Sequence, residues 1–338
     1  MKTLVCTTPG QLEYHEAQAP QSAEGRAIIR IRRIGICGTD LHAFEGTQPY
    51  FEYPRILGHE LAGELTDTGG AKGFVKGEAV TFIPYFNCGQ CIACRSGLPN
   101  CCVQMKVCGV HVHGGFAEYL SVPAASLLKG DGLSWDELAL VEPLAIGAHA
   151  VRRASVRLGE FVLIAGAGPI GLGIAEFARI AGSKVIMLDI NYERLEFCKQ
   201  HLAVALTINP AKEDVMSLLR DITNGEMPTV VIDATGNLKA INSSFQYMAH
   251  GAKYVLVGLQ KGDISFSHPE FHKREATLMS SRNATRADFE HVMNSMKNGL
   301  VKPATYITHR VSFDEVKNNF ASWLNPATGV VKAMVEMD

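Results

Sequence analysis

The sequence of 338 residues is long enough for two domains, and 47% of its residues are hydrophobic, as expected of a globular protein. Its 32 basic and 34 acidic residues are interspersed, and the net charge of −2 excludes the basic surface on which nucleic-acid or anionic-membrane binding depends. No apolar run reaches membrane-spanning length, and nine cysteines without a signal-peptide pattern indicate a reducing compartment. We therefore expect a cytoplasmic protein without nucleic-acid or membrane partners.

Residues 1–150 have the pattern of short strands separated by glycine-containing turns, which predicts a mainly β domain. From residue 151 to about 286 the pattern changes to fully apolar strands alternating with helices, which predicts a parallel sheet covered on both faces. Residues 287–338 resume the earlier pattern after one helix, so we expect the chain to return to the first domain. The predicted fold class is α/β with two domains.

Four cysteines lie within a lobe of about residues 85–105, in the pattern C-x₂-C-x₂-C-x₇-C. Glycines and a proline interrupt this stretch, so a loop folded around one ion explains the convergence of four thiols better than a helix or strand. A closed tetrathiolate site is typical of structural Zn²⁺. The alternatives are an iron–sulfur site and a disulfide cluster, and the reducing compartment argues against disulfides. The four cysteines are Cys88, Cys91, Cys94 and Cys102.

The hexad at residues 166–171 has the pattern G-x-G-x-x-G between an apolar strand and a helix, which is the context of a dinucleotide-binding loop. Asp189 ends the next strand 18 residues after Gly171 and is placed to accept hydrogen bonds from the ribose hydroxyls. Its charge would repel a 2′-phosphate, which favours NAD over NADP. The alternative is a packing turn with a solvated aspartate.

Further cofactor contacts are assigned around this loop and after the later strands of the sheet. Arg194 is a candidate for stacking on adenine, although a surface helix arginine is an equal alternative. The remaining candidates are Gly166, Gly168, Pro169, Ile170, Asp233, Thr235, Val257, Gly258 and Leu259.

A thiol, an imidazole and two carboxylates form a second candidate metal set: Cys37, His59, Glu60 and Glu142. Singly none of them is convincing, because a lone histidine in an apolar segment is more often an ordinary core or surface residue. Because these residues occur together with the thiol lobe and the glycine loop, a metal site becomes the favoured interpretation of the set.

In these motifs the chain resembles the zinc-dependent medium-chain dehydrogenases. The resemblance rests on residues 37–42, 58–63 (Gly-His-Glu-Leu-Ala-Gly), the thiol lobe, 142–144 and the glycine loop, which follow one another in family order. It implies a GroES-like catalytic domain interrupted by a Rossmann domain, with the active site in the cleft between them. It also implies a homodimer or homotetramer, for which an edge strand around Phe266 is a candidate contact.

The resemblance implies a second, catalytic Zn²⁺ on Cys37, His59 and either Glu142 or Glu60. One thiolate and two carboxylates would make the site net negative and weaken its Lewis acidity, so we expect one carboxylate to ligate at a time. Asp40 is expected to orient His59, or else to be an exposed turn residue. Thr39 and His42 resemble the family's proton relay, the alternatives being a turn threonine and a surface histidine.

Glu142 stands where many alcohol dehydrogenases of the family carry cysteine, so the chain looks like the sorbitol and threonine dehydrogenase branch. Local stretches at residues 109–116, 269–275 and 281–285 resemble L-galactonate or L-gulonate 5-dehydrogenases. The expected function is hydride transfer between NAD and a secondary alcohol of a small polyol or sugar acid. The alternatives are an L-threonine 3-dehydrogenase or general alcohol dehydrogenase, and a non-catalytic zinc protein that binds NAD. Candidate substrate contacts are His111, Lys273, Arg274, Arg282 and Asn283. For each of the three cations, an ordinary surface or interface charge is the favoured alternative.

Overall fold

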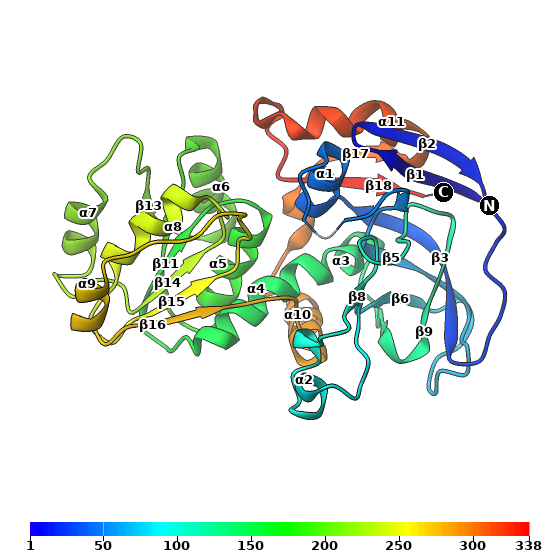
Figure 1. Cartoon of the computed structure of the whole chain (residues 1–338), viewed down its shortest axis with the longest axis horizontal. Coiled ribbons are helices and arrows are strands. Elements are labelled where there is room, and N and C mark those ends of the chain that lie inside the picture. The colour runs from blue at the N-terminus through cyan, green and yellow to red at the C-terminus, as the bar shows by residue number, and fades with distance from the viewer. Residues whose placement is uncertain (50, 338) are drawn as a thin grey trace. The chain divides into compact units, whose positions relative to one another are not determined.

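The computed structural model describes residues 1–49 and 51–337 (Figure 1). Contacts divide the chain into two units, Met1–Pro143 with Thr285–Asp338 and Leu144–Ala284, whereas the sequence pattern placed the changes near residues 150 and 286. The first boundary lies inside the helix Val141–Ala154 and the second just before the helix Arg286–Lys297. The change in sequence pattern therefore follows each boundary between the units by a few residues. None of the helices formed by the described residues is long and apolar enough to cross a membrane.

The first unit is built on a seven-stranded sheet with the order β10-β6-β5-β3-β18-β17, and β9 pairs with β3 beside it. The C-terminal strand β18 pairs antiparallel with β3, so strands from the two ends of the chain share one sheet, blue and red in Figure 1. The strands are β3 (Arg26–Gly35), β5 (Glu60–Asp67), β6 (Ala79–Phe82), β9 (Tyr119–Pro123), β10 (Leu127–Lys129), β17 (Ile307–Ser312) and β18 (Lys332–Glu336).

Two smaller sheets and short helices complete the first unit. One sheet joins β1 (Lys2–Thr8), β2 (Gln11–Glu16) and β4 (Arg55–Ile56), and the other joins β7 (Tyr85–Phe86) and β8 (Lys106–Val107). The helices are α1 (Gly38–Glu45), α2 (Ile92–Arg95), α3 (Trp135–Ala139), α10 (Arg286–Lys297) and α11 (Val316–Asn319), and α4 (Val141–Ala154) begins here and continues into the second unit. Buried aliphatic side chains of β1, β3, β5 and β18 form the core, together with aromatic side chains of other segments: Phe82, Phe116, Phe313, Phe320 and Trp323.

The second unit is a six-stranded parallel sheet with the order β13-β12-β11-β14-β15-β16. Its strands are β11 (Phe161–Ala165), β12 (Lys184–Leu188), β13 (Leu206–Ile208), β14 (Val230–Asp233), β15 (Lys253–Leu256) and β16 (Thr277–Ser280). Between them lie α5 (Pro169–Ile180), α6 (Tyr192–Leu202), α7 (Val215–Ile222), α8 (Leu238–Ser244) and α9 (His268–Lys273). Asn191, Asp214 and Asn237 cap the N-termini of three of these helices.

The structure corrects two local predictions. The sequence pattern of residues 116–120 predicts a strand, but β9 begins only at Tyr119. Residues 116–118 instead make single backbone bonds to several segments, as in Phe116 N–H to the Leu57 carbonyl at 3.0 Å and Leu4 N–H to the Phe116 carbonyl at 2.8 Å. Phe266 is also outside any strand: the edge strands of the parallel sheet are β13 and β16, and Phe266 stacks on Phe245 in the loop before α9. An aromatic residue flanked by short polar ones had the local pattern of a strand but packs as part of a loop.

The glycine hexad offers a matched test of the fold of the second unit. A Cβ added at Gly171 would lie 1.7 Å from the Gly166 carbonyl oxygen, whereas one at Gly168 would meet only the Arg194 guanidinium at 3.7 Å. We expect Gly171→Ala to destabilise the protein by about 3 kcal/mol or more, because backbone must move. Gly168→Ala should cost about 1 kcal/mol or less. Denaturant unfolding measures both, and equal losses would contradict the packing described.

Candidate metal and nucleotide sites

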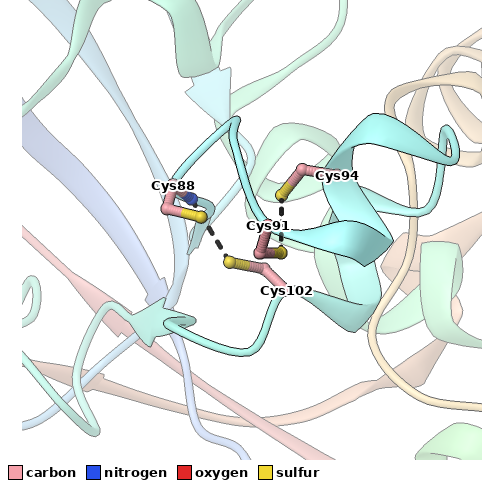
Figure 2. A group of neighbouring side chains, drawn as sticks. All are labelled: Cys88, Cys91, Cys94 and Cys102. Carbon is pink, nitrogen blue, oxygen red and sulfur yellow. Dashed lines mark hydrogen bonds between the residues drawn. The ribbon is translucent and has the colours of Figure 1, made fainter.

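The four thiols of the lobe converge on one point. Figure 2 shows the sulfurs of Cys88, Cys91, Cys94 and Cys102 turned toward one another from a loop and from α2, and their Sγ atoms all lie within 4.8 Å of one another. The Sγ atoms of Cys91 and Cys94 are 3.5 Å apart, far beyond the 2.05 Å of a disulfide bond. All nine cysteines of the chain are free thiols, so the structure contains no disulfide cluster.

Backbone N–H groups point at these sulfurs and favour their charged form. The N–H groups of Cys88 and Gln104 both donate to Cys102 Sγ at 3.3 Å. Donation from the backbone of Cys94 and Val103 lowers the pKa of Cys91 to about 6, whereas burial and the neighbouring thiols of Cys88 and Cys94 raise the pKa of Cys102 to about 11 against its backbone donors. Because the thiolate is the form that binds metal, the lobe is prepared to hold an ion through four sulfurs.

A second cluster lies where α1 and β5 begin. The ligand atoms of Cys37, His59 and Glu60 all lie within 4.8 Å of one another. Cys37 is the N-cap of α1, where its sulfur accepts the N–H of Thr39 at 3.5 Å. The set offers one sulfur, one nitrogen and carboxylate oxygen, which are the donors that Zn²⁺ takes in proteins.

Asp40 ties together the two segments that carry this cluster. Its carboxylate is buried and accepts the backbone N–H groups of Cys37 and Gly58, each at 3.0 Å. Its Oδ1 also lies 3.7 Å from His59 Nδ1, an atom that is buried without a hydrogen-bond partner. Burial raises the pKa of Asp40, and His59 and the two backbone donors oppose that shift only in part. Asp40 is therefore no exposed turn residue, and it faces the imidazole it was expected to orient.

Glu60 has a partner that the sequence analysis missed. The Lys332 ammonium donates to both carboxylate oxygens at 2.7 Å and to the Ile36 carbonyl at 3.0 Å. Glu60 is 0% exposed and Lys332 3%. Burial alone would lower the pKa of Lys332, but the negative charges of Glu60 and Cys37 raise it by more, so the ammonium stays charged. The available signal was a lysine within the otherwise apolar run of residues 330–335.

Glu142 lies outside the three-residue group and has a different partner. At the start of α4 it is 5% exposed, and the buried Tyr85 phenol donates a hydrogen bond to its Oε1. Burial, together with the charge of Glu60, raises the pKa of Glu142 to about 7, against the opposing effects of His59 and Tyr85. Tyr85 is the second residue that the sequence analysis missed.

The remaining candidates of the first unit lie on its surface. Thr39 and His42 are three residues apart on α1, and the exposed His42 has its Nδ1 3.3 Å from Thr47 Oγ1. His111 is exposed in a turn, where its Nδ1 accepts the N–H of Val107 at 3.1 Å. That bond fixes the neutral imidazole with its proton on Nε2.

In the second unit the glycine loop leads from β11 into α5. Gly166 has φ +99, a conformation open to glycine, and Gly168 is the N-cap with Pro169 at the first helical position. Asp189 Oδ2 accepts the N–H of Ala167 at 2.6 Å, so the carboxylate lies directly against the loop. The Arg194 guanidinium lies beside Gly168, on the same side as the loop.

The segments after β14 and β15 are held together by Asp233. Its buried carboxylate accepts the Thr235 hydroxyl at 2.5 Å and the Gly236 N–H at 3.1 Å, and its carbonyl accepts the N–H groups of Val257 and Gly258. A Cβ at Gly166 would lie 3.0 Å from Thr235 Cγ2, so these segments adjoin the glycine loop. Asp233 faces backbone, while Leu259 is exposed.

The cationic candidates for substrate differ in their position and contacts. Arg274 donates to the carbonyls of Met248 and Glu270 at 3.1 and 2.8 Å, so its guanidinium holds α9 in place, which argues against a substrate role. Lys273 pairs with Glu270 at 3.6 Å on the surface. Arg282 and Asn283 follow β16, and Asn283 has φ +55.

Comparison with known proteins gives the family. Residues 23–132 match the alcohol dehydrogenase GroES-like domain, and residues 169–298 match the zinc-binding dehydrogenase domain. The chain belongs to the zinc-dependent medium-chain dehydrogenases. The predicted fold class, a GroES-like domain with a Rossmann domain, is thereby confirmed, as is the activity of an NAD-dependent zinc-containing dehydrogenase.

Similar proteins include members with different substrates. The chain is 46% identical to the L-galactonate-5-dehydrogenase of Escherichia coli K12, over 93% of this chain and 92% of that protein. It is 30% identical to the L-threonine 3-dehydrogenase of Pseudoalteromonas atlantica, over 94% of each chain. The crystal structure of the alcohol dehydrogenase RspB of E. coli CFT073 with NADH has 29% identity and a TM-score of 0.92, covering 100% of this chain and 99% of that one.

The thiol lobe of this dehydrogenase can be tested by metal content. Cys94→Ser removes one of the four sulfurs, so we expect the zinc content to fall by one ion per chain and the thermal unfolding midpoint to drop. Cys101→Ser is the matched control, because Cys101 is an exposed thiol beside Cys102 but outside the cluster. Elemental analysis that finds equal zinc in the Cys94 variant and the parent would contradict the assignment.

Proposed function

We propose that this dehydrogenase transfers hydride between NAD and a secondary alcohol of a polyol or sugar acid, with L-galactonate or L-gulonate as the expected kind of substrate. One zinc ion would be structural, on the four thiols, and a second would be catalytic, on Cys37, His59 and a carboxylate. The observation that carries the proposal is the convergence of Cys37, His59 and Glu60 within 4.8 Å in a buried part of the first unit.

The residues fit a catalytic zinc ion. The donor set is sulfur, nitrogen and oxygen, and a bound ion supplies the Lewis acidity that makes an alcohol hydroxyl easier to deprotonate. Glu60 belongs to the group that shares one small volume, whereas Glu142 lies beside it with Oε1 held by Tyr85. This favours Glu60 as the carboxylate nearer the ion at rest and leaves Glu142 Oε2 available to the ion or to substrate.

The proton released from the alcohol needs a way out. Thr39 lies two residues after Cys37 and donates its backbone N–H to the Cys37 sulfur, so this residue is close enough to the metal cluster for its hydroxyl to be the first group of the relay. His42 lies one helical turn further along α1 and is exposed, so it can pass a proton to solvent. We assign the relay to these two residues.

The nucleotide contacts support NAD. Asp189 uses one acceptor position of each carboxylate oxygen on the N–H groups of Ala167 and Asn191, and its other lone pairs remain for ribose hydroxyls. We assign the pyrophosphate to the N-terminus of α5, with Arg194 beside Gly168 as its cationic neighbour. Asp233 would act indirectly, by holding in place the cofactor contacts Thr235 and residues 257–259.

The similarity to an L-galactonate-5-dehydrogenase supports a sugar acid rather than a simple alcohol. A carboxylate on the substrate needs a hydrogen-bond donor or cation, and we assign this role to Arg282, with Asn283 and the Nε2–H of His111 as partners for hydroxyl groups. L-Threonine is the second candidate substrate because of the similarity to an L-threonine 3-dehydrogenase.

Two further features are proposed with this function. The backbone of β16 forms one edge of the parallel sheet, and Phe266, which is 39% exposed, packs with Phe245 and Phe271 near that edge. We propose a homodimer or homotetramer that uses this edge. A cytoplasmic location stays a prediction of the sequence.

Reduction of NAD⁺ across hexitols, aldonates, threonine and short alcohols tests the substrate proposal. We expect L-galactonate or L-gulonate to give the highest kcat/KM, by at least about tenfold over ethanol. Highest activity with threonine would favour the second candidate, and highest activity with a short alcohol would contradict both.

Cys37→Ser tests the catalytic metal. We expect turnover to fall by about a thousandfold or more, because the variant lacks the thiolate ligand. NADH binding, followed by fluorescence, should persist, since the glycine loop lies in the other unit. Cys101→Ser again serves as the control, and unchanged turnover in the Cys37 variant would refute the metal assignment.

Asp189→Asn tests the cofactor preference with little change in shape. The amide keeps an oxygen acceptor for one backbone N–H but loses the charge that repels a 2′-phosphate. We expect the ratio of kcat/KM for NAD over NADP to fall by about tenfold. A parent enzyme that prefers NADP would overturn the argument.

A further inference from the structure

Residues of three neighbouring strands, β5, β3 and β18, fix the position of Glu60. The sheet order β5-β3-β18 places Glu60 on one side of β3 and Lys332 on the other. Gly35 on β3 faces Glu60 across the ladder, and a Cβ there would lie 2.2 Å from Glu60 Oε2. The missing side chain at Gly35 therefore makes the room through which Lys332 reaches both oxygens of Glu60.

We propose that Lys332 is a positioning residue that holds Glu60 and supplies the positive charge that allows two carboxylates to stay beside one catalytic metal ion. The inference rests on the proposed zinc site. A divalent ion with the Cys37 thiolate and the carboxylates of Glu60 and Glu142 carries a net charge of −1, and Lys332 brings the sum for this ion and these three anions to zero. The further carboxylate, Asp40, has its own donors in the backbone N–H groups of Cys37 and Gly58. Charge inside a buried cluster is costly unless it is balanced, because water does not screen it.

The contacts show that Lys332 serves this cluster. Its ammonium makes three hydrogen bonds, two to Glu60 and one to the Ile36 carbonyl, which uses its whole donor capacity. Each oxygen of Glu60 retains a lone pair for the ion, but the ammonium withdraws electron density and weakens it as a ligand. Lys332 thus prevents Glu60 from binding the ion so strongly that substrate oxygen cannot compete.

The rate at which a chelator removes the catalytic zinc tests this balance. The catalytic zinc is identified as the ion that the parent enzyme contains and Cys37→Ser lacks. Lys332→Met leaves the ion facing three anions, so release should slow by about tenfold while kcat falls and the NADH dissociation constant is unchanged. Lys332→Arg keeps the charge and should restore most of kcat. Faster or unchanged zinc release in Lys332→Met would overturn the proposal. If Lys332 only held the structure together, its loss would loosen the metal site and zinc would leave faster.

A double variant keeps the test decisive if Lys332→Met fails to fold. Glu60→Gln should release zinc faster than the parent, and Glu60→Gln with Lys332→Met should release it about tenfold more slowly than Glu60→Gln alone. Equal or faster release in the double variant contradicts charge balance. If Cys37→Ser retains all of its zinc, the proposed metal site itself fails, whatever the lysine variants do.

Discussion

Balanced charge in a buried place is the constraint on which the metal cluster depends. The buried carboxylates of Glu60 and Glu142 lie beside the half-buried thiol of Cys37, and Asp40 adds a further buried carboxylate behind His59. Such a group is stable only when each anion has a donor or a cation against it. Backbone N–H groups donate hydrogen bonds to Asp40, the Tyr85 phenol donates to Glu142, and the Lys332 ammonium donates to Glu60.

The parts of this protein that the sequence predicts are those whose information is local. The glycine hexad and the thiol lobe each fit within a short stretch, where spacing alone restricts the geometry. The parallel sheet was predictable because strands buried on both faces are apolar throughout, as at β11.

The parts that were missed depend on strand order and register. Glu60 and Lys332 are separated by 272 residues and meet only because β18 returns to pair with β3. From the sequence alone, one thiolate and two carboxylates outweigh the charge of a divalent ion, and the lysine that removes this excess of negative charge is not evident. Arg274 shows the same dependence on tertiary contacts: its sequence neighbourhood left both a substrate contact and an ordinary surface or interface charge open, and its guanidinium donates to the carbonyls of Glu270 in α9 and of Met248.

The most direct test of a shared catalytic ion is a crystal structure with diffraction recorded at the zinc absorption edge. With one structural and one catalytic zinc ion, we expect two anomalous peaks in each chain, one of them surrounded by the four thiols of the lobe. The second should lie about 2.3 Å from Cys37 Sγ and about 2.1 Å from a ring nitrogen of His59. A single peak at the lobe, with the thiol and the imidazole bound to no common ion, would contradict it.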